Sequence, residues 1–449
     1  MNENSLNTPE FSSSVPVLVC PRDQASVAER MARREALVDA ALIGSVSDLF
    51  SRVKQTGDAA VLAATRKHDG VGLGALRVPE AGIQAALAAL SPELRNAIKV
   101  ARARIEWVNR ELMPRDAVRE MEPGVRVGEL FRPLDSVALW IPCRKGPLLS
   151  TALMLVTAAR VAGVPRIVVL MPPRADGTAD PGTLAAARLA GAHDFFVGNG
   201  VSLLAAVTHG TESMPRVAGV FGPGPGGIAV AMAMAGMFGL KTVVGIGPTD
   251  CAVLADDSAD PRLVAWDLAS EAEHGPDSAA LLATPSEAFA LAVSTELTRI
   301  IESAEPSRRE NLRQVFGPTG RGMLVACPDF EAACELAARF APEHLSVVCE
   351  PELRTSAISS AVAGELLLGS YTPFAAANYA IGITAVLPTN GAARSLSGVT
   401  ARDMLRTTTL GELDQVALAS LAPTIGALAR YEGLQCHAAA AEARRAAFA

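Results

Sequence analysis

The stretch SVALWIPCRKGPLLSTALMLVTAARVAGVPRIVVLMPP, residues 136–173, decides the fold class of this chain. It begins and ends with short apolar runs, and the pattern between them, near residues 147–163, is helical. Strand, helix and strand at this spacing predict a right-handed βαβ unit in a mostly parallel sheet. The runs DFFVG at 194–198 and VAGVFGPG at 217–224 continue the alternation, with a helical pattern before each of them.

The same rhythm begins again after residue 240 and predicts a second α/β half. Its expected strands lie within KTVVGIGP, CAVLADD, AALLAT, GMLVACPD and HLSVVCE, between residues 241 and 350. We therefore predict an α/β protein with two Rossmann-like domains, an N-terminal helical region and a C-terminal helical tail. The expected boundaries are a disordered N-terminus at 1–15, a helical region at 16–130, Rossmann-like domains at 131–245 and 246–365, and a loop-rich segment with a C-terminal helical dimerisation tail at 366–449.

Composition argues against several classes of function. With 449 residues, 50% of them hydrophobic and 19% charged, the chain can bury more than one core. Its net charge of −7 and the lack of a long basic run argue against a nucleic-acid partner. Seven scattered cysteines form no CxxC pair, which is typical of reduced core residues in the cytosol. No signal peptide is recognisable and the longest apolar stretch, 228–240, is too short to span a bilayer, so we expect a soluble, cytoplasmic protein.

The turn GPGPGG at residues 222–227 matches GxGxxG after an expected strand and before an expected helix. A Rossmann fingerprint also needs an acid about twenty residues on to hold the ribose. Residues 228–249 contain no Asp or Glu, and Pro225 removes one amide that a phosphate would use. A tight strand-to-helix turn is therefore the favoured interpretation, and an atypical nucleotide contact is the alternative.

The segment ASEAEHGPDS, residues 269–278, places Glu271, Glu273 and His274 on the last turn of an expected helix. Glu271 and His274 are three residues apart and share one helix face, so both could bind one metal ion. A histidine is also favoured at a helix end by the helix dipole. The segment by itself is compatible with a metal site and with a solvated helix end.

Two further histidines stand beside acids. Glu343 and His344 lie directly before an expected strand, where a carboxylate and an imidazole are suitably placed for general base catalysis. Glu432 and His437 lie in the C-terminal helical region, and Glu432 could hold a cationic group of a substrate. The alternative for this second pair is a solvated helix face.

Longer motifs at these and other positions resemble a known family. The resemblance covers roughly residues 25–440. The segments that are similar, in order and spacing, to the signature regions of histidinol dehydrogenase are residues 140–173, GTESMPRVAGVFGPG, DLASEAEHGPDS, APEHL, NYAIGITAVLPTNGAARSLSGVTARDML and YEGLQCHAAA.

This resemblance implies a zinc-dependent homodimer that uses two NAD in succession to oxidise a primary alcohol through the aldehyde to the carboxylate. It implies that His344 is the general base and that Glu343 activates water for the second step. The implied metal ligands are Glu271, His274, Asn378 and His437. The implied substrate contacts are Thr249, Glu271, His274, His344, Asn378, Glu432 and His437. In this family the tail crosses to the partner subunit, which would place Glu432 and His437 in the neighbour's site.

Two implied ligands differ in chemical type from those of the family. Glu271 stands where the family has an amide, and Asn378 stands where it has a carboxylate. We interpret this as an exchange that keeps two oxygens, two imidazoles and one negative charge, a set that Zn²⁺ accepts. Glu273 is then a neighbouring or surface acid and not a ligand.

Other departures affect the substrate and cofactor pockets. Ala385 replaces a histidine that contacts the substrate in the family. The aromatic residue under the dinucleotide matches Trp140, whereas Ser202 and Pro225 replace Gln and Asn contacts to the cofactor. From these departures we predict an NAD- and zinc-dependent dehydrogenase of a different small primary alcohol. The alternatives are a genuine L-histidinol dehydrogenase of histidine biosynthesis and a catalytically silent binding or scaffold protein.

Overall fold

The computed structural model describes residues 14–34, 38–144, 146–224, 226–243 and 247–447. These residues fall into two compact units. Unit 1 comprises the described residues within Met1–Glu111 and Asp135–Met404, and unit 2 comprises those within Leu112–Leu134 and Leu405–Ala449. None of the described helices is long and apolar enough to cross a membrane.

The first sheet of unit 1 contains five parallel strands in the described part of the chain, in the order β6-β5-β4-β7-β8. The strands are β4 (Ser136–Trp140), β5 (Arg166–Met171), β6 (Asp194–Val197), β7 (Gly219–Phe221) and β8 (Lys241–Thr242). Strands β4 to β7 are almost wholly buried, because helices cover both faces of the sheet.

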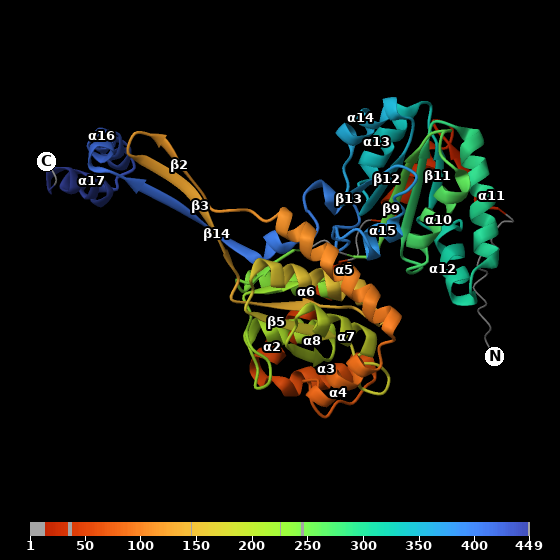
Figure 1. Ribbon diagram of the computed structural model, residues 1–449, viewed down its shortest axis with the longest axis horizontal. Helices are drawn as coiled ribbons and strands as arrows, with labels where there is room; N and C mark the ends of the chain where they lie inside the picture. Colours follow the sequence, from red (N-terminus) through yellow and green to blue (C-terminus); the bar gives the residue numbers. More distant parts are fainter. Residues whose placement is uncertain (1–13, 35–37, 145, 225, 244–246, 448–449) are drawn as a thin grey trace. The chain divides into compact units, whose positions relative to one another are not determined.

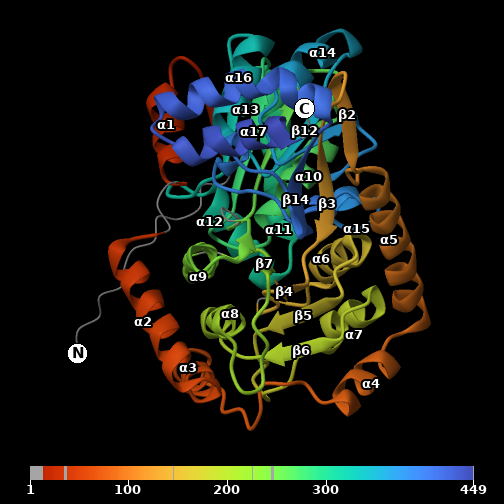
Figure 2. The same cartoon turned by 90° about the vertical axis from the view of Figure 1, so that its left-hand side faces the viewer.

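Helices from the N-terminal region and from the crossovers pack together on each face of this sheet (Figure 2). One group is α2 (Ala40–Thr56), α3 (Asp58–Asp69), α8 (Gly200–His209) and α9 (Gly227–Met237). The other group is α4 (Glu80–Ala88), α5 (Pro92–Glu111), α6 (Leu149–Ala162) and α7 (Pro181–Ala190). The expected helix near 147–163 is therefore α6, and it ends at Gly163, whose φ of 83° suits glycine.

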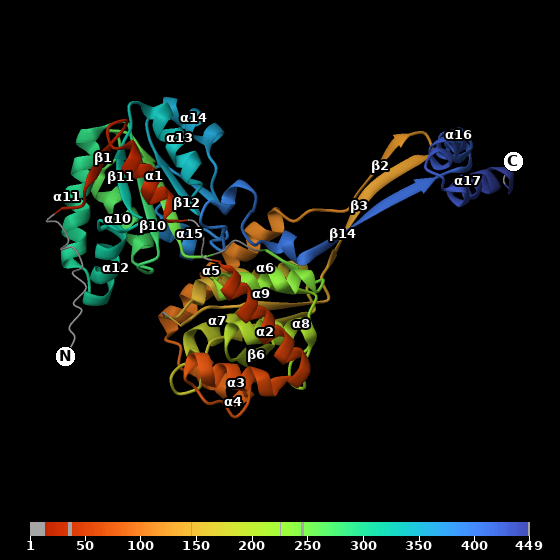
Figure 3. The same ribbon diagram turned by 180° about the vertical axis from the view of Figure 1, so that it is seen from behind.

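The second sheet of unit 1 contains six parallel strands among the described residues, in the order β1-β11-β10-β9-β12-β13. The strands are β1 (Val17–Val19), β9 (Asp250–Ala255), β10 (Ala279–Thr284), β11 (Met323–Ala326), β12 (His344–Val348) and β13 (Glu365–Leu368). Figure 3 shows the N-terminal strand β1 and helix α1 (Gln24–Ala32) beside β11, although Val17 and its register partner Leu324 lie far apart in the sequence.

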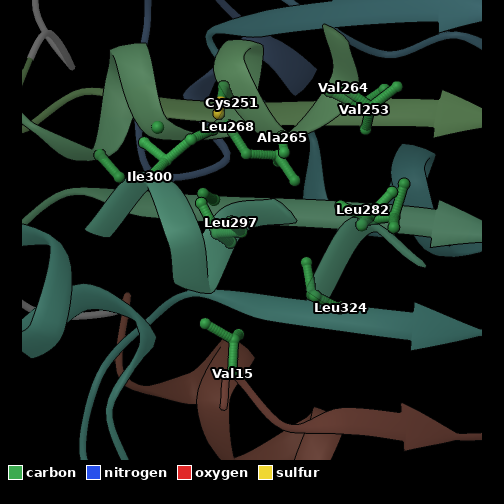
Figure 4. Packing of buried hydrophobic residues seen from close by; sticks show 14 of the residues in the cluster. Val15, Cys251, Val253, Val264, Ala265, Leu268, Leu282, Leu297, Ile300 and Leu324 are labelled. Atoms are coloured by element: carbon green, nitrogen blue, oxygen red, sulfur yellow. The ribbon is translucent and has the colours of Figure 1, made fainter. Parts of the chain in front are cut away.

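Each face of the second sheet carries its own apolar core. On one face, strand residues such as Val253, Leu282 and Leu324 pack against helix residues such as Leu268 and Leu297 (Figure 4). The helices on this face are α10 (Pro261–Ala272), α11 (Glu287–Ser303), α12 (Pro306–Phe316) and α15 (Phe374–Tyr379). The helices on the other face are α1, α13 (Phe330–Phe340) and α14 (Pro351–Ser360).

The two sheets share one strand order. In each, the earliest strand of the α/β succession (β4 or β9) lies at the centre, the next two strands extend to one side, and the following two to the other. This is the order 3-2-1-4-5 of the first five strands of a Rossmann fold, and the point where the direction reverses lies between β4 and β7 in the first sheet and between β9 and β12 in the second. The prediction of an α/β protein with two Rossmann-like sheets is confirmed.

Unit 2 is an antiparallel ribbon followed by a helix pair (Figure 1). Its described strands are β2 (Ala117–Glu122), β3 (Val125–Pro133) and β14 (Leu405–Leu413), in the order β14-β3-β2. Its helices are α16 (Gln415–Tyr431) and α17 (Gln435–Ala447), which pack on each other. The strands β1 and β2 and most of β3 lie within residues 16–130, for which the sequence indicated only helices. Short 3₁₀ helices at Ala392–Arg394 and Ala401–Met404 complete the described elements.

Candidate active site

The candidate catalytic residues lie at the amino end of the second sheet. Thr249 directly precedes β9, His344 begins β12, and Glu365 begins β13. Because these strands are adjacent and parallel, the three side chains at their amino ends lie together at one end of the sheet. Helix α10 runs back from the carboxyl end of β9, which brings Glu271, in its last turn, to the same edge. Ligands of open parallel sheets usually bind at the opposite edge.

Thr249 links two buried carboxyl groups. Its Oγ1 lies 2.9 Å from Glu343 Oε2 and 3.1 Å from Glu271 Oε2. A hydroxyl has one proton to donate, so both contacts are hydrogen bonds only if one carboxyl group is protonated. Burial raises the pKa of Glu343 to about 8, although His344 opposes the rise. Thr249 Oγ1 is thus a donor that the two carboxyl groups share, and burial favours a proton on the Glu343 carboxyl group.

His344 is surrounded by carboxyl groups. Its Nδ1 lies 2.5 Å from Glu365 Oε1, and its Nε2 lies 3.5 Å from Glu343 Oε1 and 3.8 Å from Glu271 Oε2. Burial alone would lower the pKa of His344, but Glu343, Glu271 and Glu365 outweigh burial and raise it to about 10. Three buried carboxyl groups thus share one imidazole, and the site favours a ligand that brings positive charge.

Asp250 fixes the backbone around these side chains. It is fully buried, and its carboxylate accepts hydrogen bonds from the N–H groups of Glu343, at 2.5 Å, and Asn390, at 2.6 Å. Arg34 forms an ion pair with the same carboxylate at 2.7 Å and lies over the ring of Phe340. The segment that carries Glu343 and His344 is therefore anchored from two sides.

Three of the four expected metal ligands lie close together, because Asn378 and His274 both contact Glu271. Asn378 Nδ2 donates to Glu271 Oε1 at 3.0 Å, and His274 Nε2 lies 3.7 Å from Glu271 Oε2. Glu271 is buried, whereas the His274 side chain is about half exposed. Glu273, on the same turn, is exposed. In type, these groups match a zinc site, because they offer one carboxylate, one amide whose oxygen can turn inward, and one imidazole.

The remaining expected ligand lies in unit 2. His437 and Glu432 are exposed, His437 in the first turn of α17 and Glu432 just after α16. Among the residues that the structure describes, no group of three or more His, Cys, Asp or Glu side chains is arranged to hold a metal ion. The convergence of His437 with Glu271, His274 and Asn378 stays a prediction.

The expected cofactor contacts lie at the carboxyl end of the first sheet. Trp140 is the last residue of β4, at the point where the strand order reverses, which is where dinucleotides bind in Rossmann folds. The Trp140 ring is buried, and its Nε1 has no hydrogen-bond partner among the described residues. A Cβ at Gly200 would lie 2.7 Å from this ring, and a Cβ at Gly222 would lie 2.2 Å from the Trp140 carbonyl oxygen. Glycines thus leave room around Trp140.

Ser202 adds little to this pocket. Ser202 is fully buried, its hydroxyl donates to the Asn199 carbonyl at 2.9 Å, and its N–H donates to Asn199 Oδ1 at 3.3 Å. Its polar groups are therefore used in hydrogen bonds with Asn199, the N-cap residue of α8. Pro225 lies outside the described residues. The N-termini of α8 and α9 nevertheless lie at this edge and favour an anionic group such as a phosphate.

Sequence reasoning missed Glu365 as a member of the site. The run ELLL at 365–368 contained a signal for Glu365, because it places one acid at the start of an otherwise apolar strand. No local pattern indicates Arg34, whose partner Asp250 is 216 residues away in sequence.

Comparison with known proteins gives a consistent result. The sequence model of the family described as histidinol dehydrogenase matches residues 32–445. A histidinol dehydrogenase of Synechocystis is 40% identical over 417 residues, which cover 92% of this chain and 94% of the relative. One of Xylella fastidiosa is 37% identical over 423 residues, or 94% and 97% of the two chains. The crystal structure of histidinol dehydrogenase from Elizabethkingia anophelis superposes with a TM-score of 0.89 at 29% identity, covering 96% of this chain and 98% of that one.

The prediction of a primary alcohol other than histidinol is wrong. It rested on single departures, such as Ala385 in place of histidine and the exchange of ligand types at Glu271 and Asn378. The relatives named histidinol dehydrogenase are similar to this chain over nearly its whole length, and this similarity outweighs the single departures. The resemblance of the motifs is confirmed, and the chain belongs to the histidinol dehydrogenase family.

Proposed function

We propose that this protein is an NAD-dependent L-histidinol dehydrogenase that oxidises the alcohol through the aldehyde to the carboxylate. The relatives named histidinol dehydrogenase support the substrate. The observation that carries the chemistry is the buried pair of His344 and Glu343, with Nε2 of the imidazole 3.5 Å from Oε1 of the carboxyl group. Such a pair supplies one base for each of two proton transfers.

In the first oxidation, His344 Nε2 accepts the hydroxyl proton while the carbinol carbon loses a hydride. The imidazole must first be neutral, yet the surrounding carboxyl groups hold a proton on it in the ligand-free state. A cationic ligand near Glu271 or Glu343 offsets those carboxyl groups and lowers the pKa of His344. Binding of such a ligand therefore favours the neutral form of His344, which can accept the hydroxyl proton.

In the second oxidation, water adds to the aldehyde carbon and Glu343, as the carboxylate, accepts a proton from that water. The resulting hydrate then loses a second hydride and becomes the carboxylic acid. Per molecule of alcohol, two hydrides leave and one water is consumed. Both steps use one buried edge of the sheet, so the aldehyde need not be released into water.

We propose that Glu271, His274, Asn378 and His437 hold one zinc ion and that NAD binds at the carboxyl end of β4, beside Trp140 and near Ser202 and Pro225. When bound, zinc would polarise the substrate hydroxyl, and NAD would accept each hydride. Thr249 is placed to orient Glu343 and Glu271 toward the substrate, because its hydroxyl contacts both.

We further propose a homodimer in which unit 2 of one copy completes the site of the other. Unit 2 exposes large apolar side chains to a degree unusual for a stable surface, including Met121, Val416, Leu428 and Tyr431 at 68%, 77%, 62% and 94% exposure. Glu432 directly follows Tyr431, and His437 lies in the first turn of the next helix, so a partner that covers the C-terminal end of α16 would also meet them. Glu432 would then bind the substrate's ammonium group.

The test is the formation of NADH by the purified full-length protein with L-histidinol and NAD, followed by absorbance. We expect two NADH per histidinol and histidine as product, and rescue of a histidine auxotroph. His344→Ala should lose nearly all activity. A wild-type protein that binds zinc and NAD but forms no NADH from histidinol would contradict the proposal.

A further inference from the structure

The carboxyl group of Glu365 contacts the side of His344 that faces away from Glu343. Glu365 Oε1 lies 2.5 Å from His344 Nδ1, whereas Glu343 and Glu271 face Nε2. We propose that Glu365 is a positioning residue for the reaction: it holds a proton on His344 Nδ1 and thereby presents Nε2 to the substrate hydroxyl. This inference rests on the proposed function of His344 as the base.

An imidazole that acts as a base at one ring nitrogen needs a partner that keeps the proton on the other nitrogen. In its neutral form one ring nitrogen carries the proton and the other has the free lone pair, and the hydrogen bond at one nitrogen selects between them. Glu365 can only accept at Nδ1 when ionised, so it selects the form with a proton on Nδ1 and a lone pair on Nε2. The ring of Phe374, 5.7 Å away between ring centres, also restricts how far the imidazole can rotate.

The backbone places Glu365 accurately with respect to the catalytic pair. His344 and Glu365 are register partners on the parallel strands β12 and β13. The Glu365 N–H donates to the Glu343 carbonyl at 2.9 Å, and the Gly364 N–H donates to the Pro342 carbonyl at 3.0 Å. A Cβ at Gly364 would lie 2.7 Å from the Glu343 carbonyl oxygen, so this close approach requires glycine.

A purely structural role does not explain the Glu365 carboxyl group. Its second oxygen, Oε2, is buried and has no hydrogen-bond partner among the described residues. A buried polar atom without a partner destabilises the fold. Replacement by glutamine keeps the shape of the side chain and removes its charge, so a slower reaction in this variant reports on the charge beside His344 Nδ1.

The experiment compares Glu365→Gln, Glu365→Asp and Glu365→Ala in the zinc-loaded full-length enzyme, with Ser346→Ala as the matched control. Ser346 lies two residues after His344 on the same face of β12, and its buried hydroxyl also lacks a partner among the described residues. We expect kcat with histidinol to fall on the order of 10–100-fold in Glu365→Gln, the range known for partners of metal-ligating histidines, and further in Glu365→Ala. KM should change less than kcat, Glu365→Asp should recover part of the rate, and Ser346→Ala should match the wild type.

A second measurement does not depend on turnover. In protein labelled with ¹⁵N-histidine, the wild type should show one strongly hydrogen-bonded Nδ1 proton that is absent in His344→Gln and in Glu365→Ala. An active wild type whose kcat is unchanged in Glu365→Gln and Glu365→Ala, or whose Nδ1 signal persists in Glu365→Ala, overturns the role of Glu365. A wild type that shows the Nδ1 signal, loses it in Glu365→Ala and yet forms no NADH overturns the proposed function and leaves the His344–Glu365 pair standing.

Discussion

Arg34 forms a buried ion pair with Asp250 at 2.7 Å, and this pair anchors the segment that carries Glu343 and His344. Both side chains are almost fully buried, at 6% and 1% exposure. Arg34 precedes the first sheet in sequence and Asp250 begins the central strand of the second. A residue from the N-terminal region thus supports a catalytic segment more than 300 positions later in the chain.

Removal of Arg34 should destabilise the protein strongly. Arg34→Leu would leave the Asp250 carboxylate buried without its cation, and breaking a buried pair in this way costs about 3–5 kcal/mol. Urea unfolding should show that loss in the free energy of unfolding. Arg299→Leu is the control, because its pair with Glu296 is exposed and worth about 0–1 kcal/mol. Equal losses in the free energy of unfolding in the two variants would show that the Arg34–Asp250 pair stabilises the protein no more than an exposed pair does.

Asp267 should make stability fall as the pH rises. Burial raises the pKa of Asp267 to about 7, against a hydrogen bond from the Phe374 backbone that lowers it, and Glu271 raises it further. An acid whose folded pKa lies above its unfolded value of about 3.9 binds more protons in the folded state, so stability decreases between about pH 4 and pH 7.

Asp267→Asn removes this penalty, and asparagine can still accept the Phe374 N–H. We expect the variant to be more stable than the wild type by about 1–3 kcal/mol at about pH 8, and to lose most of that advantage near pH 4, where Asp267 is neutral in the folded state and about half protonated in the unfolded state. Unfolding curves at the two pH values check this, with exposed Asp257→Asn as the control. A gain of the same size at both pH values would contradict the role of ionisation.

Most strands of both sheets are predictable because buried parallel strands are continuous apolar runs, such as RIVVLM at 166–171. The sequence prediction omitted β13, and it assigned β8 to the second half, whereas β8 pairs with β7 in the first sheet. The short strand β1 is not predictable, because its three residues are defined only by pairing with β11, more than 300 positions away. The strand β2 is not predictable either, because it is exposed along its whole length and its side chains do not alternate between buried and exposed.

Site residues likewise divide into those that a local motif reveals and those that only the fold brings together. Glu343 and His344 adjoin each other in sequence, so a motif reveals them. Glu365 lies 21 residues from His344, and only the register of β12 with β13 brings the two side chains together. Asn378 meets Glu271 across 107 residues, and there the family resemblance supplied what local sequence did not.

Glu343→Gln should separate the two oxidations. Glutamine cannot accept a proton from water, so the second step should slow by about 10²–10⁴-fold, while the first step, which depends on His344, should slow less. The aldehyde should then accumulate, and NADH formed per histidinol consumed should approach one. Trapping of the aldehyde in single-turnover reactions measures this directly. Exposed Glu273→Gln is the control, and an unchanged yield of two NADH in Glu343→Gln would assign the second base elsewhere.

Loss of a ligand should remove the metal as well as the activity. Glu271→Ala should reduce zinc bound per subunit, with affinity at least about 10–100-fold weaker, because Glu271 contacts both Asn378 and His274. Metal analysis after dialysis measures zinc without reference to turnover. Glu273→Ala, on the same helix turn but exposed, should keep its zinc. Full activity in protein stripped by a chelator would rule out the proposed metal.

A mixture of two inactive variants tests whether two copies share their sites. His344→Ala and His437→Ala should each be inactive, since one lacks the base and the other a proposed ligand. In a hybrid dimer with shared sites, one site combines His344 of the second variant with His437 of the first and is complete, whereas the other site lacks both groups. Unfolding and refolding the two variants together should therefore restore part of the activity. Without sharing, each chain keeps its own defect and the mixture stays inactive, although size-exclusion chromatography still reports a dimer.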